Sequence, residues 1–207
     1  MACEAILDVA VRQFGDRGYE GVSTRAIASA ANTVMSSITY HFGSKEGLYL
    51  ACADHIAAQI AERLHPAARA VGAPNALSRD EACAAILSLF RAMIDLMIGE
   101  ESREWAGFLI REQQTPGPAF DRLYAGAMAD VVELLVRLLV RARPDLTDSA
   151  ARAMGIALFG QTLVLRSARA SVLRVLDRDE LAATDRTLLT DTVLSNVACI
   201  LRSAPLS

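Results

Sequence analysis

Apolar residues recur at spacings of three and four along most of this chain, which is the period of an α-helix. In the first such stretch Ile6, Ala10 and Phe14 share one face, and Gly18 is placed to end the helix. Helices are predicted on this basis over residues 3–17, 25–31, 35–41, 44–64, 78–99, 102–113, 119–143, 148–165 and 184–203. We find no strand pattern, repeat or low-complexity tract in the sequence, so the fold is predicted to be all-α.

Residues 23–45 predict two short helices joined by a tight turn. Ser23 is placed to cap the first helix, and Asn32 ends it because asparagine tolerates left-handed backbone. On the second helix Ile38 and Phe42 stand four apart and point inward, so small hydroxyl residues and a tyrosine face outward. The helix-turn-helix of DNA-binding proteins has this form. The residues expected to contact DNA are Ser23, Thr24, Arg25, Ser36, Ser37, Thr39, Tyr40, His41 and Lys45.

Within that set we assign two kinds of contact. Ser36, Thr39 and Tyr40 are expected to approach base edges in the major groove. The phosphate contacts are expected from Ser23, Thr24, Arg25, His41 and Lys45.

The charge balance requires any DNA affinity to be local. The chain has a net charge of -3, whereas proteins that bind nucleic acid over their whole surface are usually basic. Acidic residues fall largely outside residues 23–45, and Lys45 is the only lysine. An alternative stays open: the N-terminal module could make protein contacts in a small-molecule-binding helical protein. A steep salt dependence of DNA binding would separate the two hypotheses.

The helix-turn-helix stretch resembles the N-terminal signature of the TetR family of transcriptional regulators. The matching residues are Ile27-Ala28, Ala31, Ile38, Tyr40-His41-Phe42 and Ser44-Lys45-Glu46-Gly47-Leu48. Residues 38–49 resemble especially the CecR-like branch, with Thr39 in place of a common Asn, and residues 111–120 resemble that branch more briefly. Asn32 stands where the family usually has Gly, and Thr33 where it has a small apolar residue.

The best boundary along the chain lies in residues 66–78, which contain two prolines and one glycine. Residues 1–46 are therefore expected to be a helix-turn-helix DNA-binding domain. Residues 47–207 are expected to be a helical ligand-binding and dimerisation domain, and helix 44–64 is expected to connect the two.

The resemblance implies a ligand-responsive repressor that binds an inverted-repeat operator in double-stranded DNA as a homodimer. In the TetR family the last two long helices pair with those of a second subunit. The last two long predicted helices here are apolar on more than one face, which suits such an interface. The residues expected there are Phe159, Leu165, Val193, Val197 and Ile200.

A small-molecule effector of unknown identity is the second expected partner. Aromatic residues and methionine can line an apolar ligand cavity, with a few polar groups as anchors, although the same residues also suit a plain core. The residues proposed to line it are Phe90, Met93, Trp105, Phe108, Arg111, Phe120, Tyr124 and Gln161.

Other classes of function find no support in the sequence. It contains no nucleophile-elbow, zinc-protease, phosphate-loop or dinucleotide-binding motif, so an enzyme is not expected. The four cysteines form no C-x-x-C pair, so neither a metal nor another cofactor is expected. No apolar run reaches the roughly 18 to 20 residues of a membrane span, and the protein is expected in the cytoplasm, not in a membrane. The hydrophobic fraction of 53% favours a buried subunit interface.

Overall fold

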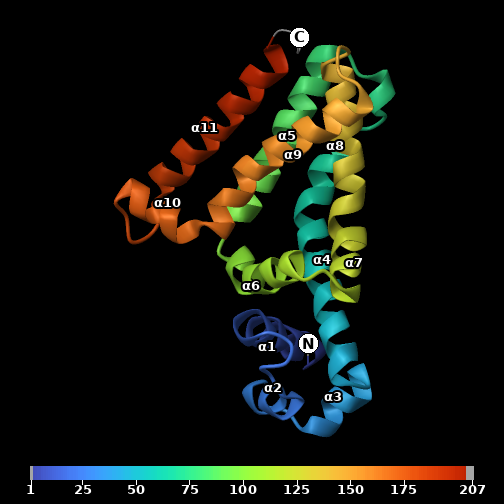
Figure 1. Cartoon of the computed structure of the whole chain (residues 1–207), viewed down its shortest axis with the longest axis vertical. Coiled ribbons are helices and arrows are strands. Elements are labelled where there is room, and N and C mark those ends of the chain that lie inside the picture. The colour runs from blue at the N-terminus through green and yellow to red at the C-terminus, as the bar shows by residue number, and fades with distance from the viewer. Residues whose placement is uncertain (1, 204–207) are drawn as a thin grey trace. The chain divides into compact units, whose positions relative to one another are not determined.

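The computed structural model describes residues 2–203, and every regular element in that range is helical (Figure 1). The elements are α1 (Ala2–Arg17), α2 (Thr24–Ala30), α3 (Met35–Phe42), α4 (Lys45–Ala70), η1 (Pro74–Ala76), α5 (Arg79–Ile98), α6 (Glu101–Gln114), α7 (Pro118–Leu123), η2 (Tyr124–Met128), α8 (Ala129–Ala142), α9 (Asp148–Ser167), α10 (Arg169–Leu176) and α11 (Ala183–Arg202). The all-α prediction is confirmed.

The structure differs from the predicted helices in three places. Helix α4 continues through Pro66 to Ala70, so the prediction that it ends before that proline is wrong. Proline in a helix interior removes one hydrogen bond and usually kinks or breaks the helix, yet α4 extends to Ala70, beyond Pro66. The predicted helix 119–143 contains a π-helical turn, η2. The short helix α10 was not predicted.

The described chain forms two compact units, each with its own buried residues. Unit 1 comprises the chain up to Ala61 together with Glu100–Met128, and unit 2 comprises Glu62–Gly99 together with the chain from Ala129 onward. Helix α4 therefore contributes to both units. This grouping differs from the predicted division at residue 46, because α6 packs against α1. As a division of roles between DNA and effector, residues 1–46 and 47–207 stay a prediction.

Unit 2 is built around α5, which packs against α8, α9 and α11. Ser78 and Glu81 form a capping box at the start of α5: the Ser78 hydroxyl accepts from the Glu81 amide, and the Glu81 carboxylate accepts from the Ser78 amide at 2.7 Å. The core of α5 includes Phe90 and Ile94, which are fully buried. A capped helix with a buried apolar face is the arrangement that the 78–99 pattern predicted.

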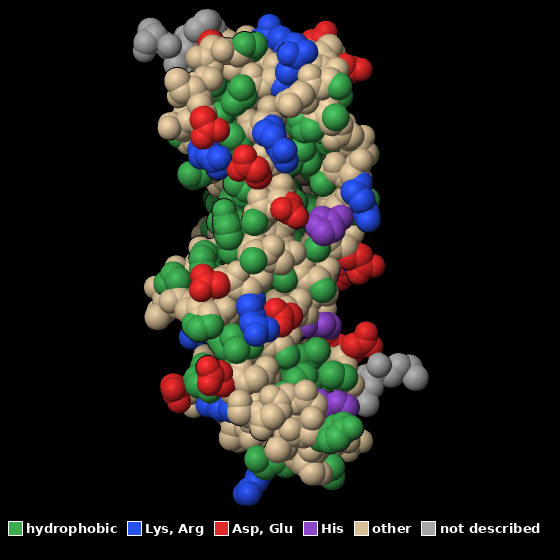
Figure 2. All heavy atoms as spheres, turned by 90° about the vertical axis from the view of Figure 1, so that its right-hand side faces the viewer, with side chains coloured by type: hydrophobic (Ala, Val, Ile, Leu, Met, Phe, Trp, Pro, Cys, Tyr) green, Lys and Arg blue, Asp and Glu red, His purple; other side chains and the backbone are tan. Residues whose placement is uncertain are grey.

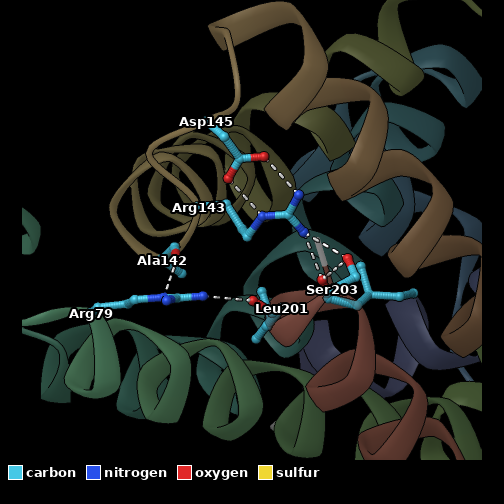
Figure 3. A network of polar contacts seen from close by, with 7 residues as sticks. Arg79, Ala142, Arg143, Asp145, Leu201 and Ser203 are labelled. Carbon is cyan, nitrogen blue, oxygen red and sulfur yellow. Dashed lines mark hydrogen bonds and ion pairs between the residues drawn. The ribbon is translucent and has the colours of Figure 1, made fainter. Parts of the chain in front are cut away.

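Arginine side chains bind the C-terminal ends of two helices in unit 2 (Figure 3). Arg143 is only 1% exposed and donates to the Ile200 carbonyl at 2.8 Å and to both carboxylate oxygens of Asp145 at 2.8 and 2.7 Å. Arg79 donates to the carbonyl oxygens of Ala142 at 3.0 Å and Leu201 at 3.5 Å. The last carbonyls of a helix lack intrahelical donors, so these guanidinium groups satisfy the C-terminal ends of α8 and α11.

Over residues 2–203 no single helix is both long and apolar enough to span a membrane. The pair α5 and α6 reaches that length and composition only when its two helices are taken together across a break.

Candidate nucleic-acid interface

The segment from Ser23 to Gly43 folds as two short helices around a left-handed turn. The Ser23 hydroxyl accepts a hydrogen bond from the Ala26 amide at 3.1 Å and so caps α2. Asn32 has φ 49°, and the Thr33 amide next to it donates to the Ala28 carbonyl at 2.9 Å. Both the predicted cap and the predicted left-handed asparagine are confirmed.

Two buried apolar side chains hold the paired helices together. Ile27 of α2 is fully buried, and Ile38 of α3 is 1% exposed. Phe42 is half-buried, which is less than the full anchoring role expected of it. Because Ile38 faces inward, the opposite side of α3 is left to solvent.

The side chains predicted to contact DNA lie mostly on this free side. Tyr40 is 85% exposed, and Ser36, Thr39 and His41 are also exposed. The Thr39 hydroxyl donates to the Met35 carbonyl at 3.3 Å, so its oxygen can still accept a hydrogen bond. Of the remaining set Ser23 and Arg25 are exposed, whereas Thr24, Ser37 and Lys45 are half-buried.

Lys45 is fixed to the module by an aromatic contact. Its ammonium group lies 4.3 Å from the centre of the Tyr19 ring, which is cation–π distance. The adjacent Ser44 hydroxyl accepts from the Gly47 amide at 3.0 Å and caps the start of α4. The single lysine of the chain is therefore held at the end of α4 that follows α3.

The helix-turn-helix stretch itself carries no acidic side chains. Residues 21–45 include Arg25 and Lys45 but no aspartate or glutamate, while Glu20 and Glu46 flank the stretch. On the face drawn in Figure 2, the lowest end of the surface shows green and blue side chains and no red ones. A polyanion in contact with residues 21–45 therefore meets no like charge from that stretch.

Two exposed apolar side chains at the start of α3 were missed by the sequence reasoning. Val34, the N-cap residue of α3, is 65% exposed, and Met35, its first residue, is 46% exposed. The helical spacing around Ile38 gives no signal for Val34, because it precedes the helix and belongs to the turn.

The module is held by an unusually close contact between α1 and α6. A Cβ on Gly107 would lie 2.9 Å from the backbone oxygen of Gly15, and a Cβ on Gly15 would lie 3.0 Å from the Phe108 amide nitrogen. Arg111 donates to the carbonyl oxygens of Gly15 and Asp16, at 2.8 Å each. Helix α6 therefore also holds the N-terminal module, through its contact with α1.

A hydrogen bond to a buried carboxylate joins α6 to α4. The Tyr49 hydroxyl donates to Glu112 at 2.6 Å, and Glu112 is only 7% exposed. Burial, followed by this hydrogen bond, raises the pKa of Tyr49 well above its ordinary value. The Tyr49 ring lies edge-on to Phe14, with centres 4.9 Å apart, and 4.6 Å from Phe108. Aromatic packing and one charged hydrogen bond thus join α1, α4 and α6.

Comparison with known proteins identifies the family. The model described as "Bacterial regulatory proteins, tetR family" matches residues 6–52, and the model described as "HTH-type transcriptional dual regulator CecR, C-terminal domain" matches residues 82–203. The HTH-type transcriptional dual regulator CecR of Shigella flexneri is 32% identical over 176 residues, which make up 83% of this chain and 78% of that protein. The chain belongs to the TetR family. The predicted resemblance to its CecR-like branch is also confirmed.

Two solved structures share the fold of this TetR-family chain. One is AibR in complex with isovaleryl coenzyme A and operator DNA, with a TM-score of 0.67, 18% identity and 97% of each chain covered. The other is FadR from Bacillus subtilis in complex with stearoyl-CoA, with a TM-score of 0.61, 16% identity, and 94% of this chain and 97% of that chain covered.

The residues predicted to line an effector cavity divide between the two units of the TetR-family chain. Phe90 and Met93 are buried in unit 2, where Gln161 accepts from the Asn196 amide at 3.3 Å. The others belong to unit 1: they are Trp105, Phe108, Arg111, Phe120 and Tyr124.

Arg111 is the clearest departure from that prediction. Its Nε and one terminal nitrogen donate to the end of α1, so this guanidinium already has a structural role. Phe108 packs against Tyr49, and Trp105 is 2% exposed. Phe120 and Tyr124 lie together, with ring centres 6.2 Å apart, and Tyr124 is 42% exposed.

An open groove of about 500 Å³ lies between α5 and α11 in unit 2. It is lined by Leu87, Ser88, Arg91, Asp191, Leu194 and Ser195, none of which belongs to the predicted set. Over the described residues no group of three or more side chains is placed to hold a metal ion.

The residues predicted for the dimer interface are mostly turned inward. Leu165, Val193 and Val197 are 3%, 7% and 0% exposed, so they contact other helices of the same chain. Phe159 and Ile200 are half-buried. The large apolar side chains that α9 and α11 leave in solvent are instead Ile156, Leu163, Val164 and Leu188.

Proposed function

We propose that the chain is a homodimeric, cytoplasmic repressor that binds an inverted-repeat operator through α2 and α3, and leaves it when a small molecule binds. The observation that carries the proposal is the acid-free surface of residues 21–45, on which polar side chains project from a helix anchored by Ile27 and Ile38. This is the arrangement by which a helix-turn-helix places its second helix in the major groove. Regulation, not catalysis, is the activity proposed.

The contacts divide into two kinds. Ser36, Thr39 and Tyr40 reach base edges. Ser36 and Tyr40 stand two residues from Ile38 and so lie on the opposite side of α3, and Thr39 is exposed on its flank. Their hydroxyl groups can both donate and accept hydrogen bonds, which suits several bases. Contacts to phosphates come from Ser23, Thr24, Arg25, His41 and Lys45. Ser37 lies on the flank of α3 and supports the same surface.

Dimerisation is proposed to use the exposed apolar side chains of α9 and α11. Ile156 is 74% exposed, Leu188 58%, Val164 44% and Leu163 41%. One short recognition helix contacts few bases, so useful affinity needs two copies placed about 34 to 36 Å apart or a little more. A two-fold dimer would present two α3 helices to the two halves of an inverted repeat.

The effector is proposed to act by changing the placement of the two α3 helices. Both α4 and α6 hold the N-terminal module, so a ligand that moves either helix would alter how the dimer meets DNA. Such a ligand must bind the DNA-incompetent state more tightly, and by linkage DNA must weaken ligand binding by the same factor, about 5- to 150-fold for typical systems. Titrating the fluorescence of the single Trp105 with candidate ligands, with and without operator, measures this coupling. Equal affinities in the two titrations would contradict effector control.

The DNA contacts are tested by two substitutions that should change DNA binding in different ways. Lys45→Ala removes one charge near phosphate, so it should weaken binding to all sequences alike and reduce the slope of log affinity against log salt by about one. Thr39→Ala should instead change the preference among operator variants. Arg137→Ala, on an exposed position of α8, is the matched control and should leave the slope unchanged. If Lys45→Ala behaves like Arg137→Ala, the phosphate assignment is wrong.

A further inference from the structure

Val34 and Met35 are exposed apolar side chains at the start of α3, a helix whose other exposed side chains are polar. Val34 is 65% exposed and Met35 46% exposed, and they stand at the N-terminal end of α3. Neither side chain carries a hydrogen-bond donor, so neither can bind phosphate. Single exposed apolar residues are common and need no explanation, so the position of this pair is what matters.

The position is the one that meets bases in a helix-turn-helix. The N-terminal residues of the recognition helix contact base edges in the major groove. Among the groups exposed there, the 5-methyl group of thymine is the one that binds apolar side chains. A donor or acceptor on a base edge that packed against Val34 or Met35 would lose its hydrogen bond to water and would gain no hydrogen-bond partner in return.

The backbone around this pair is fixed before any DNA arrives. Asn32 holds the left-handed turn with φ 49°. The Val34 carbonyl accepts from the Ser37 amide at 3.0 Å, and the Met35 carbonyl accepts from the Thr39 hydroxyl at 3.3 Å. Val34 is also β-branched and therefore stiff at χ1. A side chain presented in a fixed position loses little entropy on contact, which favours its use in recognition.

We infer that Val34 and Met35 read a thymine 5-methyl group in each operator half-site, and so help to determine which sequence is bound. The inference rests on the proposed DNA-binding function and names one specificity determinant within it. Burying one methyl group is worth about 0.8 kcal/mol, which corresponds to about a fourfold change in affinity. This is enough to discriminate a base without dominating the total affinity.

The test replaces thymine by deoxyuridine, which lacks only the 5-methyl group. The probe is a fluorescent duplex spanning the inverted repeat beside the chain's own gene, with each thymine replaced in turn, and the full-length dimer is titrated at fixed salt. We expect one replacement in each half-site to weaken binding by about fourfold. Val34→Ala or Met35→Ala should bind the thymine duplex more weakly and should no longer distinguish it from that deoxyuridine duplex.

Val175→Ala is the matched control. Val175 is 84% exposed on α10, in the other unit, so this variant should keep the wild-type response to deoxyuridine. Circular dichroism should show unchanged helix content in all three variants, because all three positions are exposed.

Two results would overturn the inference, and they are distinguishable from failure of the proposed function. Wild-type protein that binds the duplex specifically but is insensitive to every deoxyuridine replacement rules out methyl recognition. A sensitive position that stays equally sensitive in Val34→Ala and Met35→Ala assigns that contact to other residues. Absence of any specific DNA binding by the wild type would instead overturn the proposed function itself, and this inference with it.

Discussion

The crossing of α1 and α6 at two glycines predicts that Gly107→Ala destabilises unit 1. The new Cβ would lie 2.9 Å from the backbone oxygen of Gly15 and 3.1 Å from its carbonyl carbon. Backbone atoms cannot rotate away as a side chain can, so the two helices must separate. Overpacking of this kind typically costs about 1–3 kcal/mol. Alanine favours a helix over glycine by about 1 kcal/mol, so the free energy of unfolding should fall by about 0–2 kcal/mol.

Gly155→Ala is the matched control for this prediction. Gly155 is also a helical glycine, and its added Cβ would lie 3.6 Å from Leu139 Cδ1 and 3.7 Å from Leu135 Cδ2, which is ordinary contact. This variant should therefore gain up to about 1 kcal/mol from helix propensity.

Urea denaturation followed by the fluorescence of Trp105 is the suitable assay, because Trp105 lies on α6 and is buried. The two variants should differ by about 1–3 kcal/mol, which is the overpacking cost alone. Because α6 also holds α1 through Arg111, Gly107→Ala should in addition weaken operator binding. If Gly107→Ala is as stable as Gly155→Ala, the close docking of α6 on α1 is wrong.

Three further substitutions test other parts of the account. The hydrogen bonds from Arg143 lower the pKa of Asp145 in the folded protein. The ionised carboxylate therefore stabilises the fold above the unfolded-state pKa, and this stability is lost as the pH falls through the lower folded-state pKa. Asp145→Asn should remove this part of the decrease in unfolding free energy, which is expected below about pH 4. Tyr49→Phe leaves the buried Glu112 without its hydroxyl donor and should cost about 1–3 kcal/mol in urea denaturation. Ile156→Asp places a charge on the proposed dimer face and should give folded monomers in sedimentation, whereas a variant dimer as stable as the wild type would exclude that face.

The sequence was sufficient for the local structure of the helix-turn-helix. Ser23 caps α2, Asn32 is left-handed and Ile38 is buried, as their positions predicted. These features depend on neighbours within a few residues, so spacing and residue type carry the information. The exposure of Val34 depends on the direction of the turn instead, and helical spacing does not report it.

Long-range packing was predicted less well. The apolar pattern of α11 indicated that Val197 is buried but not against which helix, and the structure places it within its own chain. Arg111 looked like a ligand anchor because a charged residue among aromatics suggests a binding site. Its donors instead reach Gly15 and Asp16, which are 96 and 95 residues away along the chain. No pattern in the sequence connects residues at that separation.

Binding to an operator with altered half-site spacing tests the central claim most directly. Footprinting on the DNA beside the chain's own gene should show two protected half-sites about one helical turn apart or a little more. Inserting about 5 bp between them turns one half-site to the opposite side of the duplex, so a dimer with two α3 helices should lose most of its affinity. Inserting about 5 bp outside both half-sites should have no effect. Equal binding to all three duplexes, or binding without a footprint, would contradict recognition by a pair of helix-turn-helix modules.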